Sequence, residues 1–396
     1  MGSENVGNSQ IIIVITILVF VLIFTQTSSN KEWPNLTSKY IHNASNINEF
    51  LLKNIESYQP SHGYTPKKGL HIPEIYLNRQ DTSCPLAQNE KGRIDKMPNL
   101  IAVGFGKCGT GSLSFLDCHS QIVFRFVEPA FSWLMYNAKK KKKPTTEQAL
   151  AAYNLPKAHE SEILVEKSPG YMNGKTDKML KRYEAMKYFS PRVKILVLLC
   201  DPMHRLWSHL KMHGKEEYYL DFAEMANEKW MPAMQNFTYD ERHNILDLPV
   251  FAADLKNIGK NSSEYMKKVL LMGLYYSRLS VLLKAFGKDR VLLLDGDNLI
   301  SDPGEEFGLV EEFVGVDKEL TFEFATRYPY PCLDEPVPMC LPSSKGTSHG
   351  STKQPNSTLL FNFYQKEMQM LKSLLKTFPD YDPDSNRFQW LHKYDL

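Results

Sequence analysis

The chain has 396 residues, of which 42% are hydrophobic and 23% are charged. This composition excludes a fibrous or disordered protein, and the length fits one large folded unit with appendages. Lys and Arg total 47 against 45 Asp and Glu, a net charge of +2, which gives no reason to expect a protein that coats nucleic acid. Six cysteines are too few for a disulfide-dense scaffold but allow one or two bridges in an oxidising compartment.

The N-terminal region contains an apolar run without a charge, residues 11–24. Its length suits a signal-peptide core and is marginal for a bilayer span, so a retained anchor and a cleaved signal both remain open. N-glycosylation sequons begin at Asn35, Asn43, Asn236, Asn261 and Asn356. Together with the apolar run they favour a single-pass protein that faces the secretory lumen.

The rest of the chain divides by composition. We expect a cytosolic tail at 1–10, a transmembrane signal-anchor at 11–25, a lumenal stem at 26–94 and one folded domain at 95–396. The stem is rich in Asn, Ser, Pro and Lys and lacks sustained periodicity, which is typical of a spacer.

Beyond the stem, short apolar runs alternate with stretches of helical periodicity. The runs are 100–105, 163–166, 193–199 and 290–295. Buried strands separated by helices are typical of an α/β fold with a mainly parallel sheet covered on both faces. From Met266, apolar residues recur at helical spacing as far as Gly287, and glycine is a favourable residue just past a helix end.

A glycine-rich turn, GKCGTGS (106–112), follows the first apolar run. A strand, such a turn and a helix start form an anion site, because backbone N–H groups converge there and the helix dipole adds positive charge. Lys107 adds a full charge. The turn is a poor match to an ATP-binding P-loop, since Ile101 stands where that motif needs glycine and Cys108 where it needs the hydroxyl that binds Mg²⁺. We therefore predict a phosphate site without a metal ion.

Seven sequence blocks follow one another along the chain. They are AVGFGKCGTGSLSFL (102–116), EP (128–129), EKSPGYM (166–172), VLLCDPMHRLWSHL (197–210), GLYYSRL (273–279), LLLDGDNLISDP (292–303) and CLPSSKG (340–346). In this order they resemble the Golgi heparan sulfate sulfotransferases, in particular the glucosaminyl 3-O-sulfotransferases and the sulfotransferase half of the N-deacetylase/N-sulfotransferases. The resemblance implies a P-loop-like α/β fold, 3′-phosphoadenylyl sulfate (PAPS) as donor, a sulfated product and no metal ion.

The resemblance also implies which residues bind the donor. Lys107 would contact the 5′-phosphosulfate, and Ser208 would bind the 3′-phosphate. Cys200 stands where relatives carry an arginine for that phosphate, and Arg205 is the candidate substitute. The expected donor-binding residues are Lys107, Cys108, Gly109, Thr110, Gly111, Ser112, Cys200, Arg205, Ser208, Tyr330, Lys345, Gly346 and Thr347.

Catalytic roles follow from the same resemblance. Glu128 aligns with the family's catalytic base on the acceptor side. Lys107 and Lys345 would stabilise the charge that develops on the leaving phosphate. Ala130 and Trp133 stand where the 3-O-sulfotransferases carry histidine and aspartate, which leaves the sulfated position open.

The cysteines receive different expectations. In the family, a disulfide between the positions of Cys332 and Cys340 holds a loop over the nucleotide, and Tyr330 or Tyr328 would stack on adenine. Thr347 replaces an arginine usual in relatives. Cys84 and Cys118 have no assigned partner. We expect Cys108 to be a free thiol at the site.

A basic segment, Lys139 to Lys143, follows the Glu128 block. It is either a solvated loop or a contact for an anionic glycan; the acceptor-binding residues that we expect are Lys139, Lys140, Lys141 and Lys167. The prediction is a Golgi type II membrane sulfotransferase that acts on a glycosaminoglycan such as heparan sulfate. The alternatives are a glycan-binding protein with the same fold but no turnover and, less favoured, a P-loop kinase.

Overall fold

The computed structural model of the chain describes residues 84, 92–126, 145–153, 156–173, 176–231, 268–324, 331–341, 354–379, 381–382 and 385–395. All of them belong to one compact unit, residues 64–396. The apolar run 11–24, the sequons at Asn35, Asn43, Asn236 and Asn261, and the basic segment 139–143 lie outside these residues.

A parallel sheet of five strands forms the centre of this unit. Its order is β2 (Ile122–Phe126), β3 (Ile163–Lys167), β1 (Leu100–Gly104), β4 (Lys194–Leu199) and β5 (Val291–Asp295). All neighbouring pairs are parallel. Every residue of β1 and β5 is buried, because helices cover both faces and leave no solvated side that would require polar residues.

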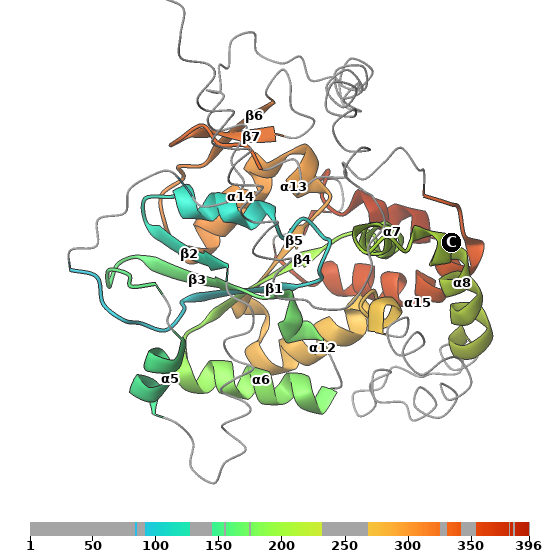
Figure 1. Ribbon diagram of the computed structural model, residues 1–396, viewed down its shortest axis with the longest axis horizontal. Helices are drawn as coiled ribbons and strands as arrows, with labels where there is room; N and C mark the ends of the chain where they lie inside the picture. Colours follow the sequence, from blue (N-terminus) through green and yellow to red (C-terminus); the bar gives the residue numbers. More distant parts are fainter. Residues whose placement is uncertain are drawn as a thin grey trace, which may run out of the picture. The chain divides into compact units, whose positions relative to one another are not determined.

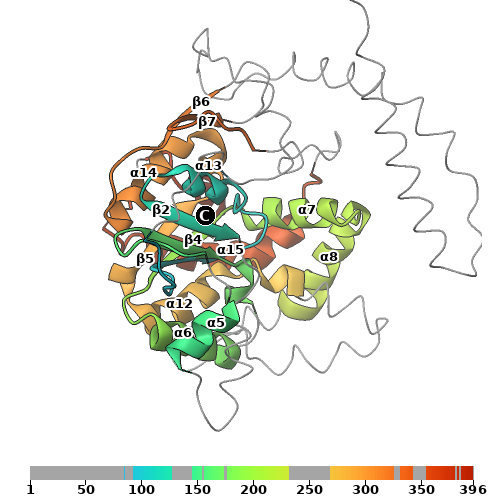
Figure 2. The same ribbon diagram turned by 60° about the vertical axis from the view of Figure 1, so that its left-hand side comes forward.

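Helices lie on both faces of the sheet (Figures 1 and 2). Helices α6 (Thr176–Phe189) and α12 (Tyr275–Phe286) pack together on one face. Helices α13 (Asn298–Ser301) and α14 (Pro303–Val314) lie on the other. The predicted α/β fold with a parallel sheet between helices is confirmed.

The remaining elements surround this core. They are η1 (Ser112–Cys118), α5 (Thr146–Tyr153), η2 (Pro169–Met172), α7 (Pro202–Met212), η3 (Glu216–Tyr218), α8 (Tyr219–Met225), the π-helical turn η4 (Ala226–Trp230), η7 (Lys288–Arg290), α15 (Thr358–Leu375), η9 (Gln389–Tyr394) and an antiparallel pair, β6 (Thr321–Phe324) with β7 (Pro331–Glu335). Helix α15 packs against α7, α8 and α12. Helix α7 starts directly after β4, where Asp201 accepts a hydrogen bond from the Met203 N–H at 3.0 Å and Pro202 occupies the first turn, both favourable at a helix start.

The structure differs from the sequence-based expectations in three places. The sequence predicts no strand at β2. Residues after the glycine-rich turn form the 3₁₀ helix η1 instead of an α-helix. The helical pattern from Met266 is interrupted at residues 272–274, before α12 begins. A Cβ atom on Gly273 would lie 2.6 Å from the Tyr364 ring, so the close contact with α15 explains why glycine stands at this interruption.

We predict that Gly273→Ala lowers the free energy of unfolding by about 1–3 kcal/mol, because the new methyl group must displace the ring of Tyr364 in a packed core. The matched control is Gly308→Ala within α14, where an added Cβ meets no atom within 4 Å. The control should be neutral or stabilising by up to about 1 kcal/mol, since alanine favours a helix interior. Chemical denaturation measures both; equal effects would contradict this packing argument.

Candidate functional site

The glycine-rich turn lies at the edge of the sheet where the strand order changes direction. Strand β1 has β3 on one side and β4 on the other, and ligands of open α/β sheets bind outside the carboxyl ends of the strands at such a switch point. Lys107 has φ +80° and Gly109 has φ +74°. A non-glycine residue with positive φ is strained, and such residues cluster at functional sites. The turn is therefore the first element of the candidate site.

The turn packs tightly on the loop after β5. A Cβ atom on Gly296 would lie 2.5 Å from the Cys108 carbonyl oxygen, and one on Gly109 would lie 3.1 Å from the Gly296 oxygen. The Gly296 N–H also donates to the Leu199 carbonyl at 2.6 Å. Two glycines thus let the turn approach the ends of β4 and β5 backbone to backbone.

The structure joins all six cysteines in disulfides: Cys84–Cys118, Cys108–Cys200 and Cys332–Cys340. The expected pairing of Cys332 with Cys340 is present. The prediction of a free thiol at Cys108 is wrong. Cys108 and Cys200 follow neighbouring parallel strands whose carboxyl ends meet at one edge, and their Cα atoms are 5.2 Å apart, a separation that suits a disulfide.

Hydroxyl groups of the turn are engaged within it. The Ser112 hydroxyl donates to the Gly109 carbonyl at 2.7 Å, and the Ser114 hydroxyl donates to the Gly111 carbonyl at 2.9 Å. Thr110 is half-buried. The two serines therefore stabilise the turn and the start of η1 by these bonds. Because the Ser112 hydroxyl already donates to Gly109, it can only accept a hydrogen bond from a ligand while that bond is kept.

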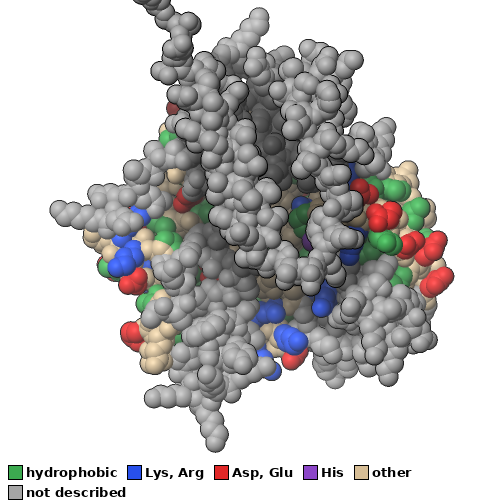
Figure 3. Space-filling view, in the orientation of Figure 1, with side chains coloured by type: hydrophobic (Ala, Val, Ile, Leu, Met, Phe, Trp, Pro, Cys, Tyr) green, Lys and Arg blue, Asp and Glu red, His purple; other side chains and the backbone are tan. Residues whose placement is uncertain are grey.

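Positive charge gathers where α7 passes the turn. The Lys107 ammonium donates to the Met212 sulfur at 3.5 Å, and the rings of His209 and His213 have centroids 4.8 Å apart. Burial, together with the smaller effects of Arg205, His213, Lys107 and Lys215, lowers the pKa of His209 to about 3. Figure 3 shows Lys and Arg side chains with a His on this face. Such a cluster favours an anionic ligand.

Two donor-binding candidates on α7 differ in placement. Ser208 is half-buried and lies next to His209 on the helix. Arg205 is fully buried, and its Nη2 donates to the Val269 carbonyl at 2.6 Å. A direct contact between Arg205 and the donor stays a prediction. Lys167, a candidate for the acceptor, is also buried, at the carboxyl end of β3 beside β1.

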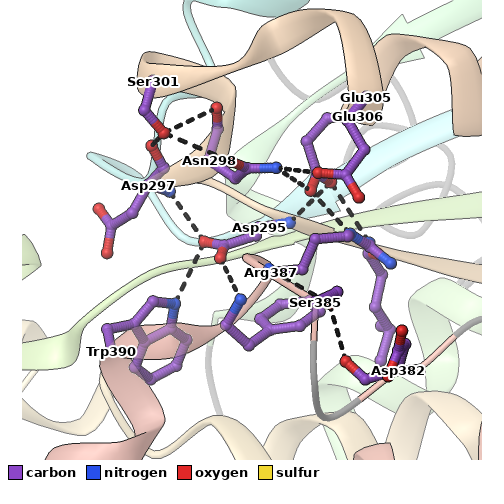
Figure 4. A network of polar contacts seen from close by, with 12 residues as sticks. Asp295, Asp297, Asn298, Ser301, Glu305, Glu306, Asp382, Ser385, Arg387 and Trp390 are labelled. Carbon is purple, nitrogen blue, oxygen red and sulfur yellow. Dashed lines mark hydrogen bonds and ion pairs between the residues drawn. The ribbon is translucent and has the colours of Figure 1, made fainter. Parts of the chain in front are cut away.

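A polar network closes the carboxyl end of β5 (Figure 4). Asp295 accepts hydrogen bonds from the Asp297 N–H at 2.9 Å, the Trp390 indole at 3.2 Å and the Phe388 N–H. Arg387 pairs with Glu306 at 2.7 Å. Burial and, after it, the nearby negative charge of Asp297 raise the pKa of Asp295 to about 7. The network holds the C-terminal segment against the site.

Sequence reasoning did not predict the contacts that several residues of this region make. The Tyr275 hydroxyl lies 3.6 Å from the Cys108 sulfur and 3.9 Å from the Cys200 sulfur. Asp201, past the end of β4, accepts from Lys393 and, at 3.1 Å, from the Tyr394 hydroxyl. Tyr275 lies in a matching block, GLYYSRL, but only the fold reveals its position beneath the turn.

Several predicted site residues lie outside the described residues: Glu128, Tyr328, Tyr330, Lys345, Gly346 and Thr347. Among the sequons, Asn356 is described; it is exposed, one residue before the Ser357 cap of α15.

In the described part of the chain, no three His, Cys, Asp or Glu side chains are grouped to hold a metal ion, and no helix of that part is long and apolar enough to cross a bilayer.

We predict that Asp295 makes stability fall as pH rises. Its folded pKa of about 7 lies above its ordinary value of 3.8, so the folded chain binds more protons than the unfolded chain between about pH 4 and pH 7. The contribution of Asp295 is present at the acidic end of this window and is lost toward pH 7. The excess stability of wild type over Asp295→Asn should shrink across it by at least about 1 kcal/mol.

Denaturant titrations at several pH values measure this excess. Asp289→Asn, on the exposed surface of η7, is the matched control and should keep the slope of the wild type. Parallel pH profiles of wild type and Asp295→Asn would contradict the assignment.

The chain is similar in sequence to known sulfotransferases. A family model described as "Sulfotransferase domain" matches residues 97–325. Heparan sulfate glucosamine 3-O-sulfotransferase 6 of Homo sapiens is 28% identical over 310 residues, which cover 76% of this chain and 76% of that protein. For the human 3-O-sulfotransferase 3B1 the identity is 26% over 297 residues, covering 72% of this chain and 65% of that protein.

A third relative adds a second kind of enzyme. The human bifunctional heparan sulfate N-deacetylase/N-sulfotransferase 3 is 24% identical over 289 residues, which cover 71% of this chain and 30% of that protein. The family model spans more than half of the chain, and the chain therefore belongs to the sulfotransferase domain family.

Proposed function

We propose that the protein transfers a sulfuryl group from PAPS to a hydroxyl or amine of a glycosaminoglycan such as heparan sulfate. The observation that carries this proposal is the strained, lysine-bearing turn at the switch point of the sheet, in a chain of the sulfotransferase family. The relatives named above are heparan sulfate enzymes of two kinds, O- and N-sulfotransferases. The position that is sulfated remains outside the proposal.

The residues of the turn fit a phosphosulfate. Lys107 brings a positive charge to it, and Lys215, three residues past the end of α7, adds a second charge that acts on His209. The His209 ring is neutral at ordinary pH because its pKa is about 3, so it offers a hydrogen bond rather than a charge. Position 108, where an ATP-binding P-loop carries the hydroxyl for Mg²⁺, is a disulfide-bonded cysteine, and this favours a phosphosulfate over Mg-ATP.

The reaction is an in-line displacement at sulfur. A base takes the acceptor proton, the acceptor oxygen or nitrogen bonds to sulfur, and the bond from sulfur to the leaving phosphate oxygen breaks. Lys107 would neutralise the charge on that oxygen, and the backbone N–H groups of the turn would hold the phosphate. We assign the base to Glu128 and further positive charge to Lys345. Ser208 would hold the 3′-phosphate.

The acceptor and the compartment complete the proposal. An anionic glycan fits a cationic acceptor side, to which we assign Lys139, Lys140 and Lys141. The apolar run 11–24 would be the signal-anchor of a type II Golgi membrane protein with its catalytic domain in the lumen. An oxidising lumen also suits three disulfides.

We predict that Lys107→Ala weakens binding of adenosine 3′,5′-bisphosphate by about ten-fold or more, because a charge-assisted hydrogen bond contributes about 1.5–3 kcal/mol. Lys181→Ala, on the exposed surface of α6, is the matched control and should bind as the wild type does. Calorimetric titration without Mg²⁺ measures both. Equal affinity of the two variants would remove Lys107 from the site.

We further predict transfer of labelled sulfate from PAPS to a glycan in a panel of heparan sulfate precursors and other glycosaminoglycans. Glu128→Gln should lower the rate by about 10²-fold or more while the bisphosphate still binds, since a general base contributes on that order. Glycan binding by the wild type without any transfer would favour the non-catalytic alternative. Stabilisation by Mg-ATP but not by the bisphosphate would favour a kinase.

A further inference from the structure

The Cys108–Cys200 disulfide crosses the edge of the sheet at the candidate donor site. Strands β1 and β4 pair in parallel as far as Gly104 and Leu198, and the two cysteines follow these residues on either side of the switch point. Cys108 is 1% exposed and Cys200 is 2% exposed. The disulfide thus joins the turn after β1 covalently to the residue that follows β4, just beyond the last paired residues of the two strands.

The surroundings of this disulfide fix Cys108 from several sides. The Tyr275 hydroxyl lies against both sulfurs, and since neither sulfur carries a hydrogen the hydroxyl faces them as the donor. The Tyr275 ring packs on Phe105 with centroids 4.3 Å apart. On the backbone side, the Cys108 carbonyl lies so close to Gly296 that no Cβ fits between them. Side chain and main chain of Cys108 are therefore both held.

Cys108 also lies between the two residues of the turn with positive φ. Lys107 and Gly109 have φ of +80° and +74°, and a lysine is strained in that region because its side chain favours negative φ. Because Cys108 is fixed, fewer backbone conformations are open to Lys107 and Gly109 on either side of it. The N–H groups of the turn and the Lys107 ammonium then have their bound arrangement before a ligand arrives.

We propose that the Cys108–Cys200 disulfide is a positioning element for donor binding, which holds the turn in the conformation that receives the phosphosulfate. The proposal rests on the proposed function. Without the link, the turn gains conformations that donor binding must remove, and this ordering cost weakens affinity. A disulfide that served stability alone would lower the melting temperature and leave the affinity of the folded protein unchanged.

The experiment compares the full chain in detergent with two double variants, Cys108→Ala/Cys200→Ala and Cys108→Ser/Cys200→Ser. The control is Cys84→Ser/Cys118→Ser, which removes the disulfide that ends η1 and leaves the turn linked. The probe is adenosine 3′,5′-bisphosphate, titrated calorimetrically at a temperature where circular dichroism shows each variant folded.

We expect both Cys108/Cys200 variants to bind the bisphosphate on the order of ten-fold more weakly, which is the effect of ordering about one extra residue. The control should bind within about two-fold of the wild type, although it too loses a cross-link. Equal affinity of all variants overturns the positioning role while leaving the donor assignment intact. No binding by the wild type overturns the donor assignment, and with it this proposal.

Two measurements on the wild type need no folded variant. Peptide mapping under non-reducing conditions should recover Cys108 joined to Cys200, and free or differently paired cysteines overturn the proposal. Amide hydrogen exchange without ligand should show slow exchange at Cys108 and Ser112, whose N–H groups donate to Phe105 and Gly109. Fast exchange at both would mean that the turn is not preformed, and would overturn it as well.

Discussion

The close approach of three backbone segments at the carboxyl edge of the sheet is the constraint on which the site depends. The turn after β1, the end of β4 and the loop after β5 meet where Gly296 touches the Cys108 carbonyl and donates to Leu199. Parallel strands bring their carboxyl ends to one edge, but side chains normally keep the following loops apart. Glycine at 296 and at 109 removes those side chains, so the turn is supported by backbone that has few alternative positions.

The C-terminal segment completes this edge from the outside. Asp201 follows β4 and Asp295 ends β5; the first accepts from Lys393 and Tyr394, and the second from Phe388 and Trp390. Carboxylates at the strand ends thus bind the last described residues of the chain, far away in sequence. Because Asp295 is buried and near Asp297, its charge is costly, and the donors around it offset part of that cost. The acidic residues of this edge therefore have structural partners within the protein.

The sequence predicted the strands of the sheet better than the contacts at its edge. The runs at 100–105, 163–166, 193–199 and 290–295 became β1, β3, β4 and β5, in that order, with ends shifted by one residue at most, because a strand buried on both faces must be continuously apolar. Strand β2 carries Arg125 and pairs on one side only, so its pattern is weaker. The interruption before α12 depends on the Tyr364 ring, 91 positions away from Gly273, and no local pattern predicts such a contact.

The candidate site was predicted as a set of positions but not as an arrangement. The turn and Lys107 could be found because charge and glycine content are local properties of the sequence, whereas Ser208 was named only through the resemblance to the family. The link between Cys108 and Cys200 could not, since cysteine pairing depends on which strands are neighbours, and six cysteines allow many pairings. Tyr275 was missed for the same reason: a tyrosine in a helix is usually a core residue, and only the order of the strands places this one beneath the turn.

The two cysteines change how the near-neutral charge of the chain relates to an anionic ligand. Sequence reasoning treats Cys200 as a lost arginine, which removes one charge-assisted bond from the donor site. In the structure the same residue forms a covalent bond to the turn, while Lys107 and Lys215 supply local charge. A bond formed before the ligand arrives lowers the ordering cost of binding, whereas an arginine adds attraction after arrival. Either effect would raise affinity, so the absence of the arginine does not by itself argue against donor binding.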